Sequence, residues 1–70
     1  MRLYDLRMAA GLSADELGTE AGVSGDTIRN LEQGGAPQAR TAGKLIAYFS
    51  RRLDREITAS ELFDREPEAA

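Results

Sequence analysis

Residues 12–34 constrain the fold more than any other part of the chain, because they encode two short helices joined by a tight turn. Ser13 and Glu16 have the S-x-x-E spacing of a capping box, in which each side chain bonds the backbone N–H of the other residue. This spacing predicts that the first of the two helices begins at Ala14. Gly22 follows the apolar positions of that helix, where a left-handed C-cap residue is expected.

Small residues in this helix indicate close packing. Leu17 and Ala21 lie four residues apart and give the helix one apolar face. Gly18 lies between them, where glycine costs about 1 kcal/mol relative to alanine. That cost indicates that another helix packs against the backbone at Gly18, and Val23 is expected to be a buried anchor in the turn.

The second helix combines two inward aliphatic residues with a polar face. Ser24 is a favourable N-cap, and we expect the helix to run from residue 25 to residue 32 or 33. Ile28 and Leu31 form its inward stripe. Two helices joined in this way form a helix-turn-helix, whose second helix typically enters the DNA major groove. The side chains that point elsewhere, and that are able to bond base edges or phosphates, are Arg29, Asn30 and Gln33.

The flanking sequence predicts three more helices within one small domain, because 70 residues allow a single core. We expect helices over about 2–10 and from residue 38 or 39 to 53. A short last helix, containing Leu62 and Phe63, should begin at a second capping box over residues 58–61. One explanation of the charged stretch 50–56 is a fourth helix that projects beyond the core. The residues expected to face inward from the first and fourth helices are Leu3, Leu6, Ala10, Ala42, Leu45, Ile46, Phe49 and Leu53.

The ordered set of these residues resembles the lambda-type repressor and Cro proteins of phages, often called the XRE family. The resemblance covers roughly residues 3–63 and implies an all-α, compact bundle of five short helices with a central helix-turn-helix. It implies a DNA-binding domain over 1–63, followed by an acidic, flexible tail over 64–70. The matching residues are Leu6, Arg7, Gly11, Leu12, Ser13, Glu16, Leu17, Ala21, Gly22, Val23, Ser24, Thr27, Ile28, Leu31, Glu32, Gly34, Pro37, Thr41, Lys44, Glu61, Leu62 and Phe63.

The function implied is sequence-specific binding of double-stranded DNA by a small transcriptional regulator, with recognition helix 25–33 in the major groove. Many family members carry long polar side chains where this chain has Ala14, Gly25 and Asp26. Asp26 accepts a hydrogen bond from a cytosine amine, or it only places a favourable charge at a helix N-terminus. The predicted DNA-contacting residues are Ala14, Ser24, Gly25, Asp26, Thr27, Arg29, Asn30, Gln33, Arg40 and Lys44.

The resemblance also implies an ion pair between Arg7 and Glu32, which joins the first helix to the end of the recognition helix. Both residues are out of place on otherwise apolar stripes. The alternative is that they are two separate solvated charges. If the pair forms, it contributes orientation more than net stability, because desolvation offsets much of the Coulomb attraction.

The net charge of −3 argues against strong DNA binding by a monomer, because phosphate contacts supply most non-specific affinity. We expect weak, salt-sensitive binding that depends on a homodimer or on a protein partner. A two-fold dimer would read half-sites about 34 Å apart. The candidate dimer surface consists of Tyr48, Leu53, Ile57 and Phe63; the alternative is that these residues complete the core.

Two other functions stay open. The first is an excisionase-like or MerR-like DNA-architectural protein, which needs a basic β-hairpin where residues 41–53 instead have a helical pattern. The second is a protein-binding module of the antirepressor or antitoxin kind, which the acidity favours. The chain has no Cys or His, and no Gly-rich phosphate cradle. We therefore expect no enzymatic activity, cofactor, metal or small-molecule ligand.

The location expected for the chain is the cytoplasm of a bacterium or a phage-infected host, in association with the nucleoid. No apolar segment approaches the roughly 20 residues that span a bilayer, and no signal-peptide pattern opens the sequence.

Overall fold

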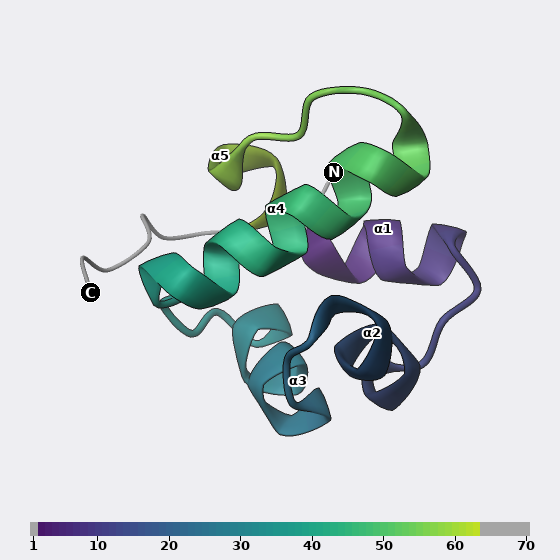
Figure 1. Cartoon of the computed structure of the whole chain (residues 1–70). Coiled ribbons are helices and arrows are strands. Elements are labelled where there is room, and N and C mark those ends of the chain that lie inside the picture. The colour runs from purple at the N-terminus through teal and green to yellow at the C-terminus, as the bar shows by residue number, and fades with distance from the viewer. Residues whose placement is uncertain (1, 64–70) are drawn as a thin grey trace.

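The computed structural model describes residues 2–63, and every regular element in this range is a helix. The helices are α1 (Leu3–Ala9), α2 (Ala14–Ala21), α3 (Gly25–Glu32), α4 (Ala39–Leu53) and α5 (Ala59–Leu62). Helix α4 lies across the bundle, with α2 and α3 on one side and α5 on the other (Figure 1). The predicted all-α bundle of five helices is thus confirmed. The predicted tail, 64–70, lies outside the described residues.

The predicted boundaries are close to those observed. Helix α1 begins one residue later and ends one residue earlier than expected, and α3 ends at Glu32. Residues 39–53 form a helix where an excisionase-like or MerR-like protein needs a β-hairpin, which counts against that alternative. None of the helices in the described range is both long enough and apolar enough to cross a lipid bilayer.

All five helices contribute side chains to one hydrophobic core. The inward stripes predicted for α1 and α4 are largely confirmed, but Leu53 is 40% exposed and that prediction is wrong. Its place in the core is taken by Ile57, which is only 2% exposed. The buried hydrophobic residues are Leu3, Leu6, Ala14, Leu17, Ile28, Leu31, Ala42, Leu45, Tyr48, Phe49, Ile57, Leu62 and Phe63.

The chain reverses direction directly after α4. Asp54 caps the helix with a left-handed backbone, φ 53° and ψ 44°. The chain then returns to the bundle, and the backbone N–H of Ile57 donates to Ser50 Oγ at 3.2 Å. The predicted end of the fourth helix at residue 53 is confirmed, but a projecting helix does not explain the charged stretch 50–56, because the loop after Leu53 brings Ile57 back into the core.

The capping box predicted for α5 does not form. Thr58 is the N-cap residue but its side chain caps no backbone N–H; its Oγ1 instead lies 3.1 Å from Ser60 Oγ. Glu61, the expected partner, accepts from Arg55 Nη1 at 3.0 Å. The short helix is held by burial of Leu62 and of Phe63, its C-cap residue, rather than by its cap.

The predicted dimer surface is also wrong for most of its members. Tyr48, Ile57 and Phe63 are buried within the protomer, and only Leu53 is exposed. The Tyr48 hydroxyl donates to Glu20 Oε1 at 2.7 Å and so joins α4 to α2. Burial, and then this hydrogen bond, raise the pKa of Tyr48. The alternative interpretation, that these residues complete a small core, holds for the three buried ones.

The local signals around the first helix of the pair are confirmed. Ser13 Oγ accepts from the Glu16 N–H at 3.0 Å, and Glu16 Oε1 accepts from the Ser13 N–H at 2.9 Å. Gly22 has the left-handed conformation, with φ 81° and ψ 34°. A Cβ on Gly18 would collide with the carbonyl oxygen of Val23 and lie 3.1 Å from the Gly25 nitrogen. The close neighbour of Gly18 is therefore the turn and the first residue of α3, not the side of another helix.

Candidate nucleic-acid interface

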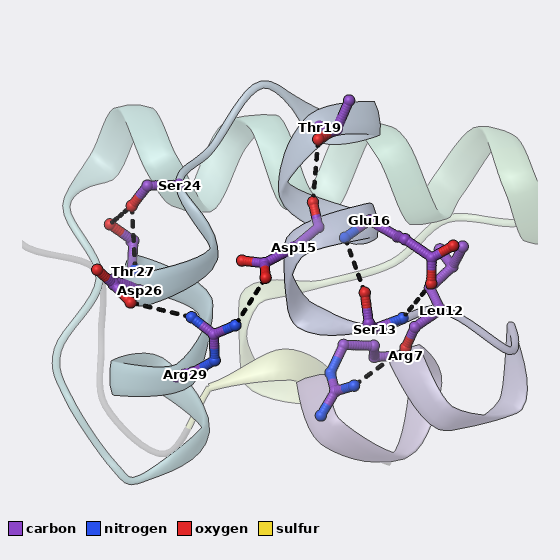
Figure 2. Close-up of polar contacts among 10 residues, drawn as sticks. All are labelled: Arg7, Leu12, Ser13, Asp15, Glu16, Thr19, Ser24, Asp26, Thr27 and Arg29. Atoms are coloured by element: carbon purple, nitrogen blue, oxygen red, sulfur yellow. Dashed lines mark hydrogen bonds and ion pairs between the residues drawn. The ribbon is translucent and has the colours of Figure 1, made fainter.

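The cap and the buried stripe of α3 together decide which face of the helix reaches solvent. Ser24 Oγ accepts from the Thr27 N–H at 3.1 Å and lies 2.7 Å from Thr27 Oγ1, so both hydroxyls are occupied at the start of the helix (Figure 2). Ile28 and Leu31 are buried in the core. The side chains left on the outer face are Asp26, Arg29, Asn30 and Gln33, all of them exposed.

Arg29 lies between two carboxylates. Its Nη1 donates to Asp26 Oδ1 at 2.9 Å, and its Nη2 pairs with Asp15 Oδ2 at 3.0 Å (Figure 2). Asp15 belongs to α2, so one guanidinium joins the two helices of the helix-turn-helix. Asp15 is not among the site residues that the sequence predicts. The three-residue spacing of Asp26 and Arg29 was visible in the sequence, but the contact with α2 depends on how the helices cross.

Two residues predicted to contact DNA offer it no side chain. Ala14 is 6% exposed and packs in the core, so its side chain presents almost no surface to a duplex. Gly25 is half-buried against Asp15: a Cβ at Gly25 would collide with Asp15 Oδ1 and lie 3.2 Å from the Asp15 Cα. A glycine at the start of α3 is thus what allows the Asp15 carboxylate to lie over that end of the helix.

Two basic residues lie in the first half of α4, the helix that follows α3 in the chain. Arg40 is exposed in the first turn of α4 and forms no hydrogen bond or ion pair within residues 2–63. That turn contains no acidic residue, and no side chain caps it. Lys44, one turn further on, donates from Nζ to the carbonyl oxygen of Gly22 at 3.1 Å. Lys44 therefore neutralises the negative end of α2, whereas Arg40 is available to an external anion.

A small groove separates the outer face of α3 from the beginning of α4. Its volume is about 240 Å³, and polar side chains from both helices reach it. Asn30 lines it, and the Asn30 side chain lies close against Gly35: a Cβ added to Gly35 would be only 3.0 Å from Asn30 Nδ2. The lining residues are Thr27, Asn30, Leu31, Ala36, Pro37, Gln38 and Thr41.

The ion pair between Arg7 and Glu32 is present and bidentate. Arg7 Nε and Nη2 donate to the two carboxylate oxygens of Glu32, at 2.6 and 2.9 Å, and Nη1 donates to the carbonyl oxygen of Leu12 at 3.0 Å. The side chains of the pair are only 13% and 11% exposed. The hydrogen bonding that Arg7 donates to the Glu32 carboxylate raises the pKa of Arg7. The pair fixes the end of α3 to α1, and so sets the direction in which the outer face of α3 points.

Within the described residues, no three acidic side chains are grouped so that they could hold a metal ion.

Comparison with known families agrees with this geometry. A family model described as "Transcription regulator-like HTH domain" matches residues 1–60, which include all of α1 to α4. Searches of curated proteins and of solved structures found no match.

Proposed function

The chain belongs to the transcription regulator-like helix-turn-helix domain family, and from this membership we propose that it binds double-stranded DNA sequence-specifically as a small transcriptional regulator. In this proposal α3 is the recognition helix and lies in the major groove. The observation that carries the proposal is the outer face of α3, where Asn30 and Gln33 stand exposed on a helix anchored by Ile28 and Leu31.

The proposed type of regulator is a phage or prophage protein of the lambda repressor or Cro kind. The order of the five helices supports this subtype, and so does the bidentate pair of Arg7 and Glu32. The proposal includes a cytoplasmic, nucleoid-associated location and no enzymatic activity or small-molecule ligand. Repression, rather than activation, is the role that follows from the resemblance to this subtype.

The beginning of α4 is the proposed phosphate contact. The first N–H groups of a helix attract anions, and this first turn has neither a side-chain cap nor an acidic residue. Arg40 adds a full positive charge in the same turn. The groove beside Asn30 is also lined by Gln38 and Thr41 at the beginning of α4, so a phosphate contact there would set the register of α3 on the duplex.

A homodimer is part of the proposal, because the acids on α2 lower the affinity of a single unit for DNA. Asp15, Glu16 and Glu20 are all exposed on that helix. The same acidity favours a second candidate function, in which the helix-turn-helix binds a basic protein partner. The buried residues Tyr48, Ile57 and Phe63 are not the dimer surface in this proposal.

The experiment that tests the proposal is selection of sites from a randomised DNA pool at low salt, followed by a salt titration of the winning site. We expect a two-fold motif whose affinity falls steeply with salt. Asn30→Ala should relax one position of the motif and cost about 1–3 kcal/mol. Arg40→Ala should weaken binding to all sequences and lower the salt slope by about 1, while Arg51→Ala is the matched control on the distal part of α4.

Failure of the selection has a defined meaning. If no sequence is enriched and no duplex is bound even at low salt, DNA binding is refuted and the protein-binding alternative is favoured. If Arg40→Ala and Arg51→Ala lower the salt slope equally, the beginning of α4 is not a special phosphate contact.

A further inference from the structure

Arg29 is the only cation in α3, and in the free protein both of its terminal nitrogens pair with acids of the same chain. Each of its terminal nitrogens faces a different carboxylate, Asp26 at 2.9 Å and Asp15 at 3.0 Å. A bidentate contact with guanine needs two adjacent N–H groups of the guanidinium directed at the base edge. Both ion pairs draw the guanidinium of Arg29 toward Asp15 and Asp26, so a bidentate contact with a guanine competes with them.

The arrangement leaves the beginning of α3 negative, because two carboxylates face one guanidinium. Their charges are well exposed: the side chain of Asp15 is 74% exposed and that of Asp26 is 97% exposed. A negative surface at this end of the helix repels the phosphates of any duplex that approaches. Ion pairs as exposed as these contribute little to stability, so they can be exchanged for other contacts.

The Asp15 side chain lies against the beginning of α3. Its carboxylate occupies the space that a Cβ at residue 25 would need, so Gly25 is the residue that admits it. Asp15 therefore approaches both the beginning of α3 and Arg29, which places it as a restraint on the recognition helix rather than as an isolated surface charge.

We propose that Asp15 and Asp26 are specificity-determining residues, because they hold Arg29 until a DNA site offers it a better contact. This inference rests on the proposed DNA-binding function. A DNA site with two correctly placed hydrogen-bond acceptors replaces both carboxylates as partners of Arg29 in one step. The new contact compensates for leaving Asp15 and Asp26 unpaired. A lone phosphate offers less, so Arg29 stays with its acids on non-cognate DNA and the carboxylates continue to repel the duplex. The pair thus lowers non-specific affinity more than specific affinity.

The test compares Asp15→Asn with the wild type on two duplexes, the selected site and a scrambled sequence of the same length. The matched control is Asp54→Asn. It removes the same charge at the C-terminal end of α4, away from α3 (Figure 1), and asparagine tolerates the left-handed backbone there. Thermal unfolding of each variant establishes that it is folded.

We expect Asp15→Asn to tighten binding to the scrambled duplex by about tenfold at 50 mM salt and to increase its salt slope by about 0.9, as one additional phosphate contact would. Binding to the selected site should tighten less, so the ratio of the two affinities falls. Adding Arg29→Ala to Asp15→Asn should abolish the gain, because the gain depends on a guanidinium that Asp15 no longer holds and that only the exposed Asp26 still pairs with.

Two results would overturn the inference while the proposed function stands. In the first, the wild type prefers the selected site but Asp15→Asn and Asp54→Asn change scrambled-duplex binding equally, so only net charge matters. In the second, the gain survives in the double variant, so Arg29 is not the group released. If the wild type and Asp15→Asn bind neither duplex even at low salt, the proposed function fails, and the inference fails with it.

Discussion

Replacing Gly18 with alanine should destabilise the protein, although the same change in an ordinary helix stabilises it. Gly18 lies inside α2, and its carbonyl oxygen accepts from the N–H groups of Gly22 and Val23, both at 2.8 Å. A Cβ at this position would collide with the Val23 carbonyl oxygen and lie 3.2 Å from the carbonyl carbon of Ser24. These neighbours are backbone atoms, which cannot rotate away as the end of a side chain can.

The expected change in the free energy of unfolding follows from one gain and two costs. Alanine gains about 1 kcal/mol over glycine in the interior of a helix. Forcing an extra methyl group into a packed site costs about 1–3 kcal/mol. Here the turn must also shift, which weakens the two hydrogen bonds that Gly18 accepts, each worth about 1 kcal/mol. We therefore expect a net loss of about 1–3 kcal/mol in the free energy of unfolding.

Gly43→Ala is the matched control. Gly43 lies inside α4, is exposed, and has nothing within 4 Å of the position of its Cβ. This variant should be more stable than the wild type by about 0.5–1 kcal/mol. Urea denaturation followed by circular dichroism would measure the free energy of unfolding of both variants. In thermal unfolding, their melting temperatures should differ by on the order of 10 °C. A Gly18→Ala protein as stable as the wild type would refute the argument from backbone crowding.

Three further predictions concern single side chains. Glu32→Ala should lower the free energy of unfolding by about 2–3 kcal/mol, because it leaves the Arg7 guanidinium largely buried without its bidentate partner; a smaller loss than that of an exposed Glu→Ala control would contradict this. The hydrogen bonds that Ser13 donates lower the pKa of Glu16. The cap therefore contributes stability above the ordinary pKa of 4.5 and loses it as the pH falls through the lower folded pKa. Helix content measured from pH 6 to pH 2 should show a weaker loss in Glu16→Gln than in the wild type, and identical profiles would contradict this. Leu53→Gln should change stability by less than about 0.5 kcal/mol, because Leu53 is 40% exposed; a change in oligomeric state by sedimentation, without a change in stability, would instead identify it as an interface residue.

The parts of the fold that the sequence predicts well are those decided within a few residues. The Ser13 cap, the left-handed Gly22 and the Ser24 cap each depend on side chains and backbone groups at most five residues apart. The inward positions Ile28 and Leu31 follow from the helical period, which is also local. These signals agree with one another, and that agreement is why the helix-turn-helix is readable from the chain.

The features that escaped prediction depend on contacts across the bundle. Leu53 continues the apolar stripe of α4, but the reversal at Asp54 ends the helix and places Ile57 in the core. The contact of Asp15 with Arg29 depends on the crossing of α2 and α3, which no spacing in the sequence specifies. In the candidate site, the outer face of α3 was therefore predicted, while the acids that hold its one cation were not.

The three donors of Arg7 have a consequence for motion in the protein. They reach Leu12, just before α2, and Glu32, at the end of α3, so one guanidinium closes residues 12–32 into a ring. Neither end of that ring can leave α1 without breaking charge-assisted hydrogen bonds. The two helices should therefore open to solvent together, as one cooperative unit, rather than fraying one after the other. Amide hydrogen exchange in α2 and α3 would then report a shared opening free energy, and the outer face of α3 would keep a fixed orientation relative to α2.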